Sequence, residues 1–505
     1  MENSRTKKSI LNAIMMILNT GILSVLSLIS TNLILNNYGS DFNGVVATAN
    51  QFVNLLLIVE GGFTTAINVA LFKPFVENDK KKINAIMSAA KKTFTKIGVI
   101  FLIISILASI IYPLFIRSGL EYITIFLIFL MVMLGTAYNL IFVIRHQIMF
   151  QVSQKEYVYT FYSIIINVLS SITTILLAYF KVNMLIIRLF ILVYIIINGI
   201  IIFILYKKTF KEIKTNEKED YESIKGTKDI MVQKLTSVVY MSSPLLFIST
   251  FISTKMASVY SVYNSIYNII KSFLSSMIAA PVNGFGQLLS EGKSEEVYKK
   301  FELYEFIVIL IATILLTSVL VMIIPFIKLY TINVTDINYV NMGIAVLLAS
   351  IVLTEVIHIP SGNIINVTGN FKVAKKIQAI ASIILISLLI IGGYFFKIYG
   401  VLGATLITNI ILASMEIYYA HKKIFNRNPK NFIMKLFVNL ITLIINVLVF
   451  NFIKINITSY INFFLVGIFV FTINTSIIVI INLLIFKDNT SKIINMIKGF
   501  IKRKI

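Results

Sequence analysis

Four ionisable residues lie inside long apolar stretches of the chain, at Glu60, Lys271, Glu355 and His358. A charge in the middle of a bilayer costs several kcal/mol unless it has a partner or reaches water. Lys271 offers a cation for an anionic headgroup, and Glu60 offers a carboxylate that can take up a proton. Glu355 and His358 are three residues apart, so they share one helix face and form a candidate protonatable pair. We therefore predict coupling or gating roles for Glu60, Glu355 and His358.

Each of these charges also has a structural explanation. Glu60 and Lys271 could form an ion pair that locks two helices together, and a gating pair would satisfy both interpretations. Glu355 and His358 could instead make hydrogen bonds between helices. Four further charged or basic residues lie near the ends of predicted helices, where we expect their side chains to reach back to the interface. They are Arg145, His146, Arg188 and Glu416.

Amide and tyrosine side chains follow two of the apolar stretches. The candidate cavity residues are Asn50, Asn54, Tyr263, Asn264, Tyr267 and Asn268. Asn264, Tyr267 and Lys271 are spaced by three or four residues, which places them on one side of a helix. Polar groups in hydrocarbon normally face a bundle interior or a wet cavity. The alternative is that they hydrogen-bond neighbouring helices and hold them together.

The elements that must position these residues are transmembrane helices. The 505 residues are 58% hydrophobic and 13% charged, whereas about a quarter of a soluble domain is charged. Because an apolar helix needs about 20 residues to cross a bilayer, the chain has room for about fourteen spans. The predicted spans are about 10–36, 44–72, 95–116, 122–144, 157–180, 184–206, 232–253, 258–284, 303–328, 339–366, 374–396, 400–420, 433–453 and 460–486.

The loop charges predict the orientation of these spans. With the N-terminus inside, the cytoplasmic segments contain 37 Lys and Arg residues and the outer loops contain six. Because cytoplasmic loops carry the excess of Lys and Arg, this bias predicts fourteen spans with both termini in the cytoplasm. We therefore expect a multi-pass membrane protein.

An internal repeat is visible at an offset of 214 residues, where Asn50 aligns with Asn264 and Asn54 with Asn268. Six spans per half is an even number, so the repeat predicts two pseudo-symmetric six-helix bundles of the same orientation. Such folds hold substrate in a cleft between the bundles and change access by rocking. The predicted parts are an N-terminal bundle at 1–206, a charged cytoplasmic linker at 207–231, a C-terminal bundle at 232–425, and two extra transmembrane helices with a basic tail at 426–505.

The sequence lacks the motifs that are typical of several classes of function. Cysteine is absent, and the three histidines show no metal-ligand spacing, so no metal or other cofactor is expected. No G-x-x-x-x-G-K-[ST] loop or nucleophile elbow is present, so we expect no enzyme activity. The net charge of +23 lies in loops, where it serves orientation and contact with anionic lipids and not nucleic-acid binding.

Three stretches resemble a known family. They are YGSDFNGVVATANQFVNLLLIVEGGFTTAINVALFKPFVENDKKKINAIMSAAKKTF, VYSVYNSIYNIIKSFLSSMIAAPVNGFGQLLSEG and PSGNIINVTGNFKVAKKIQAIASIILISLLIIGGYFFKIYGVLGATLITNIIL. They are similar to polysaccharide flippases of the Wzx kind, within the multidrug/oligosaccharidyl-lipid/polysaccharide (MOP) exporter superfamily. The resemblance covers most of residues 10–425 and implies an all-α, MATE-like fold.

The resemblance implies a flippase that moves an undecaprenyl-pyrophosphate-linked oligosaccharide outward by alternating access, for O-antigen, capsule or another surface polymer. Lys271 would then hold the headgroup phosphate or an acidic sugar, and the asparagines and tyrosines above would contact sugars. Partners would be this lipid-linked substrate, membrane lipids and other polysaccharide assembly proteins. The resemblance implies a cavity lined by the first, second, seventh and eighth predicted spans. Relatives that flip the peptidoglycan precursor carry several arginines in this cavity, whereas these four spans contain no arginine here.

Three alternatives remain at this stage. A cation-coupled multidrug exporter of the same fold would have an aromatic, anionic cavity. A membrane polymerase or ligase would need a sizeable outer loop, and the longest predicted one is about ten residues, around 330–338. A pure scaffold would leave the charges within the membrane unexplained.

Overall fold

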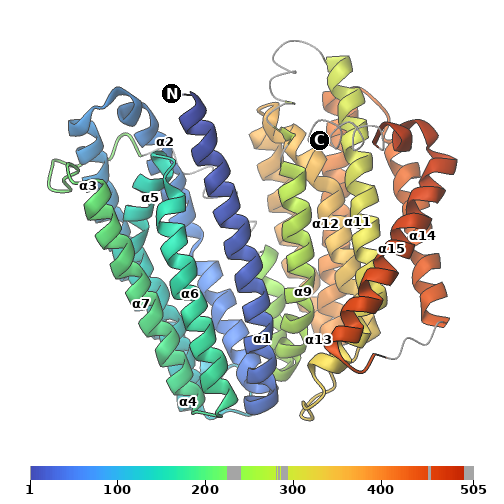
Figure 1. The fold of residues 1–505 in the computed structure, drawn as a ribbon, viewed down its shortest axis with the longest axis horizontal. Helices are drawn as coiled ribbons and strands as arrows, with labels where there is room; N and C mark the ends of the chain where they lie inside the picture. The colour runs from blue at the N-terminus through green and yellow to red at the C-terminus, as the bar shows by residue number, and fades with distance from the viewer. Residues whose placement is uncertain are drawn as a thin grey trace. The chain divides into compact units, whose positions relative to one another are not determined.

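Helices form all the regular structure in the part of the chain that the computed structural model describes, residues 2–224, 240–279, 281–282, 285, 294–452 and 457–493 (Figure 1). The α-helices are α1 Glu2–Leu56, α2 Ile58–Glu77, α3 Lys80–Ile111, α4 Tyr122–Tyr138, α5 Ile144–Val152, α6 Glu156–Tyr179, α7 Met184–Thr209, α9 Thr254–Ala279, α11 Ser294–Tyr330, α12 Met342–Val367, α13 Phe371–Tyr418, α14 Lys430–Phe452 and α15 Tyr460–Ile485. Shorter turns are η1 Tyr112–Leu114, η2 Asn139–Val143, η3 Ile248–Ile252 and η4 Tyr419–Ile424.

The chain divides into two compact units. Unit 1 comprises Met1–Ser261 with Asn333–Ile337, and unit 2 comprises Val262–Ile332 with Asn338–Ile505. Each unit is described separately below. The domain boundaries expected from the sequence remain a prediction.

The all-α polytopic architecture expected from the sequence is confirmed. Each of the fourteen predicted spans corresponds to a helix in the described residues, although the seventh is described only from Tyr240. Ten described helices are long and apolar enough to cross a membrane. Two of these contain a sharp break: Ile14–Leu56 holds most of the first predicted span and the first half of the second, and Phe371–Ile424 holds the spans predicted at 374–396 and 400–420.

Both breaks fall in the gaps between predicted spans. Gly39 has φ of 82°, which favours glycine, and it separates the first two predicted spans where a turn was expected. The break in α13 falls at Lys397, in the gap between the predicted spans 374–396 and 400–420, and not at Gly400. Gly400 lies instead inside the second half of α13, where a Cβ would collide with the backbone of Gly392. The second predicted span is also not continuous, since a turn at Leu57 separates the end of α1 from α2.

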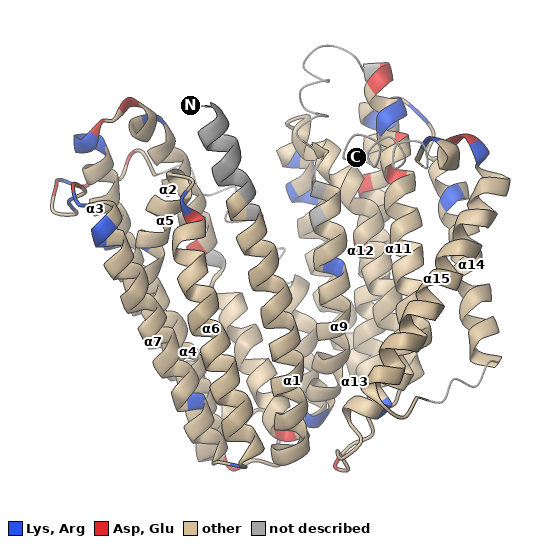
Figure 2. Ribbon diagram, viewed as in Figure 1, with Lys and Arg blue, Asp and Glu red and all other residues tan. Residues whose placement is uncertain are grey.

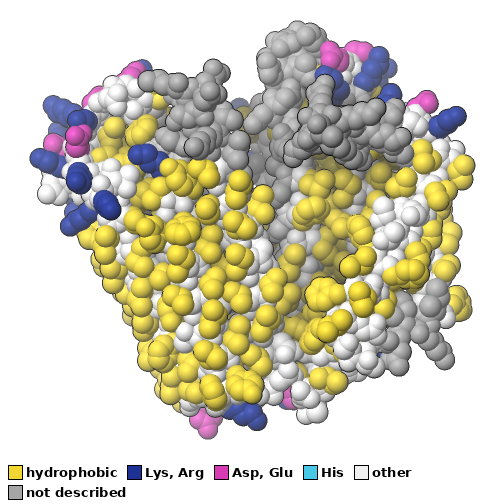
Figure 3. Space-filling view, viewed as in Figure 1, with side chains coloured by type: hydrophobic (Ala, Val, Ile, Leu, Met, Phe, Trp, Pro, Cys, Tyr) yellow, Lys and Arg dark blue, Asp and Glu magenta, His cyan; other side chains and the backbone are white. Residues whose placement is uncertain are grey.

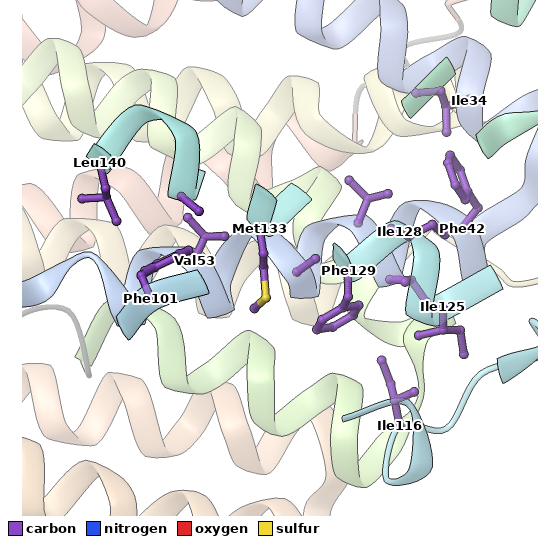
Figure 4. Close-up of a cluster of buried hydrophobic side chains, with 14 residues drawn as sticks. Ile34, Phe42, Val53, Phe101, Ile116, Ile125, Ile128, Phe129, Met133 and Leu140 are labelled. Atoms are coloured by element: carbon purple, nitrogen blue, oxygen red, sulfur yellow. The ribbon is translucent and has the colours of Figure 1, made fainter. Parts of the chain in front are cut away.

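The core of unit 1 consists of two clusters. One lies where α1, α3 and α4 pack together and includes Phe42, Phe101, Phe129 and Met133 (Figure 4). The other lies at the opposite, basic end of the unit and includes Ile224, which is outside the helices. The charged segment after α7 therefore packs against unit 1 over its first part, residues 210–224, and is not a free linker there.

In unit 2, α14 and α15 pack on α11. Ile478 of α15 contacts Leu310 and Ile314 of α11 in a small buried cluster. Asn439 of α14 and Asn482 of α15 exchange two hydrogen bonds of 3.1 and 3.0 Å between their amides. Because a buried amide is costly without partners, this exchange fixes the pair of helices.

The surface pattern is that of a membrane protein. Hydrophobic side chains cover the middle of each unit on the face drawn in Figure 3, and charged side chains gather near the helix ends. Figure 2 shows the same separation along the ribbons, with few Lys, Arg, Asp or Glu residues in the middle of the helices. The protein is therefore a multi-pass membrane protein.

Candidate functional site

Helix α12 carries a row of polar residues into the interior of unit 2. Glu355, His358 and Ser361 are spaced by three residues and lie on one helical face. Each of them bonds to a different neighbouring helix, as set out below. The row therefore links α12 to α9, α13 and α11 through polar contacts.

The first contact is an ion pair between α12 and α9. Glu355 Oε2 lies 2.6 Å from Lys271 Nζ, with side-chain exposures of 14% and 22%. A charge-assisted hydrogen bond of this length is among the stronger polar contacts. The partial exposure leaves room for water or an anionic ligand to compete for the lysine.

The second contact joins α12 to α13. His358 Nδ1 lies 2.8 Å from Glu416 Oε2, with side-chain exposures of 14% and 5%. Gly362, one turn further along α12, makes room for this carboxylate, since a Cβ there would lie 2.6 Å from Glu416 Oε2. The glycine thus permits a carboxylate to enter the helix interface.

The third contact is the most buried. Ser361 donates to Glu305 Oε1 of α11 at 3.3 Å, and the same oxygen lies 3.1 Å from His421 Nε2 of η4. The side chains of Glu305 and His421 are 2% and 1% exposed. Their second polar atoms, Glu305 Oε2 and His421 Nδ1, have no hydrogen-bond partner. Glu305 and His421 therefore form a buried acid–base contact that Ser361 ties to α12.

The structure brings two of the sequence candidates together and separates two others. Lys271 forms an ion pair with Glu355, whereas the ion-pair explanation from the sequence named Glu60 as its partner. Glu355 and His358 bind different partners and do not form the expected pair with each other. Glu60 of α2 accepts a hydrogen bond from Thr64, one turn along the same helix.

The two tyrosines do not face a cavity in this structure, which corrects the geometry expected for them. Tyr263 and Tyr267 are fully buried. The Tyr263 hydroxyl donates to the backbone carbonyl of Tyr339 at 2.8 Å, and the Tyr267 hydroxyl donates to that of Ala345 at 2.7 Å. The hydroxyls are thus used to dock α9 against the start of α12.

The four asparagines are more accessible. Asn50, Asn54 and Asn268 are exposed, and Asn264 is partly buried. Asn54 donates to Gln51 at a long 3.4 Å. Their amides are therefore accessible for a ligand, and their role in binding remains a prediction.

Solved structures with the same architecture are membrane transporters. A structure of the lipid II flippase MurJ in an inward closed conformation matches with a TM-score of 0.70 and 16% identity, over 95% of this chain and 99% of that one. An inward-facing MATE family multidrug transporter of the MOP superfamily matches with a TM-score of 0.65 and 12% identity, over 79% of this chain and 93% of that one. A structure of the MATE multidrug transporter DinF-BH matches with a TM-score of 0.56 and 16% identity, over 83% of this chain and 96% of that one.

The chain has the fold of these transporter structures. At these identities the likeness establishes the fold alone. No protein-family model matches the sequence, and the comparison with curated proteins also gave no match. The acid–base contacts that join α9, α11, α12, α13 and η4 all lie in unit 2.

Sequence reasoning missed three members of this set. Glu416 was assigned to the interface because it lies near the end of its predicted span. His421 lies beside two lysines, Lys422 and Lys423, which are typical of a cytoplasmic loop and not of a buried helix end. Glu305 is the third residue of its predicted span, and an acid inside an apolar segment was a signal that could have found it. Among the described residues, no group of three or more His, Asp or Glu side chains could hold a metal ion.

Proposed function

We propose that this protein is a Wzx-like flippase that moves an undecaprenyl-pyrophosphate-linked oligosaccharide across the bacterial cytoplasmic membrane by alternating access, with both termini in the cytoplasm. One observation carries the proposal. The lipid II flippase structure matches 95% of the chain, whereas the multidrug transporter structures cited above match 79% and 83%. The flippase structure thus aligns with a part of this chain that the drug-exporter structures do not cover.

The ion pair between Lys271 and Glu355 supports an anionic substrate. A pyrophosphate that reaches Lys271 would take over the lysine and leave the Glu355 carboxylate without its cation. Substrate binding would therefore break the contact between α9 and α12, which makes Glu355 a candidate for coupling or gating. Glu60 and the pair of His358 with Glu416 are further candidates for this role.

The test is a deletion strain that is analysed for lipid-linked intermediates and for surface polysaccharide together. We expect loss of one surface polymer, such as O-antigen or capsule, with accumulation of its lipid-linked unit at the inner leaflet. Complementation with the wild-type chain restores the polymer, and Lys271→Ala at equal expression does not. Normal polymer in the deletion strain would refute the proposal, and full complementation by Lys271→Ala would remove Lys271 from the mechanism. Co-purification would identify the assembly proteins that act with it.

A cation-coupled multidrug exporter is the second candidate, and two observations favour it. The MATE structures share the fold, and Glu305, Glu355 and Glu416 provide three buried or partly buried acids in unit 2. This candidate predicts normal polymer and new sensitivity to cationic dyes in the same deletion strain. One strain therefore separates the two candidates.

A further inference from the structure

A cavity of about 450 Å³ lies at the basic end of unit 1. Helices α3, α5 and α7 and the segment after α7 form its walls. Its cationic lining residues are Lys91, Arg145, Lys207 and Lys211. Pockets of roughly 300–1,000 Å³ are of the size that holds small ligands. The cavity belongs to unit 1 and is separate from the acid–base contacts of unit 2.

Within the described part of the chain, the cations of this cavity form no ion pair with an acid. No ion pair of Lys91, Arg145 or Lys211 occurs within the described residues. Two acids of the neighbouring segment form ion pairs with lysines outside the cavity lining, since Glu212 pairs with Lys80 and Glu219 pairs with Lys92, each at 2.5 Å. Like charges that share a pocket repel one another, so an anion in the cavity would be stabilised.

An unused hydrogen-bond donor lies in the same wall. Tyr206 is 6% exposed, and its hydroxyl has no partner although it lines the cavity. A buried hydroxyl without a hydrogen-bond partner is costly, so this side chain favours an acceptor in the cavity. Lys207 lies over the Phe203 ring at 4.6 Å, which holds that ammonium at the cavity wall.

The segment after α7 is fixed in place as the outer wall of the cavity. The Lys214 amide donates to Asn84 Oδ1 at 2.9 Å, and the Asp220 amide donates to the Ala85 carbonyl at 3.2 Å. Phe210 and Ile213 pack on the hydrophobic cluster beneath. The wall therefore presents Lys211 to the cavity at a defined place.

We propose that this cavity binds a phosphate anion, with Arg145, Lys91 and Lys211 as its charged contacts and the Tyr206 hydroxyl as a donor. The phosphate comes either from the headgroup of an anionic phospholipid or from solution. Basic pockets between transmembrane helices suit anionic lipid headgroups, and arginine forms paired hydrogen bonds with phosphate oxygens. The site does not depend on which substrate the protein transports.

The experiment uses the full chain in a neutral detergent and follows thermal unfolding by circular dichroism. The protein is titrated with phosphatidylglycerol, with phosphatidylcholine, and with inorganic phosphate against chloride at equal ionic strength. Arg145→Gln combined with Lys211→Ala removes two cations of the cavity. Lys81→Ala combined with Lys208→Ala is the charge-matched control, because both lysines are exposed and neither lines the cavity.

We expect an anion to raise the unfolding midpoint of the wild-type chain. The cavity variant should bind it about 25-fold more weakly, at about fivefold per cation, and the control should bind like wild type. A response to phosphatidylglycerol without competition by inorganic phosphate identifies a lipid headgroup, and a response to inorganic phosphate identifies a soluble ligand. The absence of any response in wild type, or equal responses in the cavity variant and the control, overturns the proposal.

A second pair of variants keeps the test valid if the double substitution prevents folding. Tyr206→Phe removes only the hydroxyl, and Lys211→Ala alone changes an exposed side chain. Each should weaken anion binding severalfold, whereas Lys208→Ala alone should not. Wild-type affinity in both of these variants would refute the site.

Discussion

Glu60 and Lys271 lie on helices that correspond in the predicted repeat, and they find partners in different ways. Glu60 in unit 1 accepts a hydrogen bond from Thr64 on its own helix. Lys271 in unit 2 reaches Glu355 on another helix. Two further acid–base contacts in unit 2 also join separate helices, from α12 to α13 and from α11 to η4.

The difference has a consequence for motion and for charge. A bond within one helix persists when that helix moves as a rigid body, whereas a bond between helices must break if the helices separate. A change in the charge of a buried residue in unit 2 therefore affects how its helices pack. The same change at the contact of Glu60 with Thr64 affects a bond within one helix. Because interfaces of this kind have discrete arrangements, protonation can shift the balance between them.

The largest effect is expected at Glu305 and His421. Removal of one partner from a buried acid–base contact typically costs about 3–5 kcal/mol, so His421→Ala should lower the free energy of unfolding by that amount. Thermal or denaturant unfolding of the purified chain measures it. Arg427→Ala is the control in the same unit, because its 2.5 Å pair with Glu295 is half exposed. Equal melting of both variants would contradict the ranking.

A smaller loss is expected for Lys271→Ala, about 1–3 kcal/mol, because the partly exposed Glu355 carboxylate that remains can recruit water. The exchange of both residues, Lys271→Glu with Glu355→Lys, should recover part of the stability. A double-mutant cycle gives the coupling energy. Coupling near zero would show that the two charges act independently. Transport by the exchanged variant then tests whether the position of the cation matters beyond stability.

Unit 1 depends on a close backbone approach at Gly44. A Cβ at this position would collide with the backbone carbonyl of Thr254, at the start of α9. Gly44→Ala should therefore destabilise the protein by about 1–3 kcal/mol, which is typical of overpacking. Gly21→Ala is the matched control, since nothing lies within 4 Å of its Cβ, and we expect it to be neutral or stabilising. Equal unfolding midpoints in the two variants would be evidence against the close approach.

The hydrogen bond from Thr64 to Glu60 should contribute less than the contacts between helices in unit 2. Thr64→Val keeps the shape of the side chain and removes the donor, at an expected cost of about 0.5–1.5 kcal/mol. Thr65→Val is a suitable comparison, because the Thr65 hydroxyl donates to the backbone carbonyl of Gly61 at 2.9 Å. A loss at Thr64 as large as that of His421→Ala would remove the contrast between the units.

The sequence predicted the helices well and their polar partners poorly, for a physical reason. A span is a local property, because about 20 apolar residues between charged loops suffice to define it. The partners of His358 and His421 are 58 and 116 residues away along the chain, so their pairing depends on how the helices pack. The spacing of Tyr263 and Tyr267 is that expected of cavity residues. Their hydroxyls, however, donate to backbone carbonyls, and no sequence pattern predicts such bonds.

The smallest effect is expected where the segment after α7 meets α3. Lys92 lowers the pKa of the Glu219 carboxyl by a hydrogen bond and by its charge. The contribution of this pair is therefore present above the ordinary Glu pKa of about 4.3 and is lost as the pH falls through the lower folded value. Because the lysine is exposed, Lys92→Ala should leave the unfolding midpoint at pH 7 unchanged.

Asn84→Ala removes the acceptor of the hydrogen bond from the Lys214 backbone amide, so it should instead free the segment after α7. Faster proteolysis after α7 would reveal this change. Faster cleavage in Lys92→Ala than in Asn84→Ala would mean that charge, and not backbone hydrogen bonding, holds this wall of the cavity.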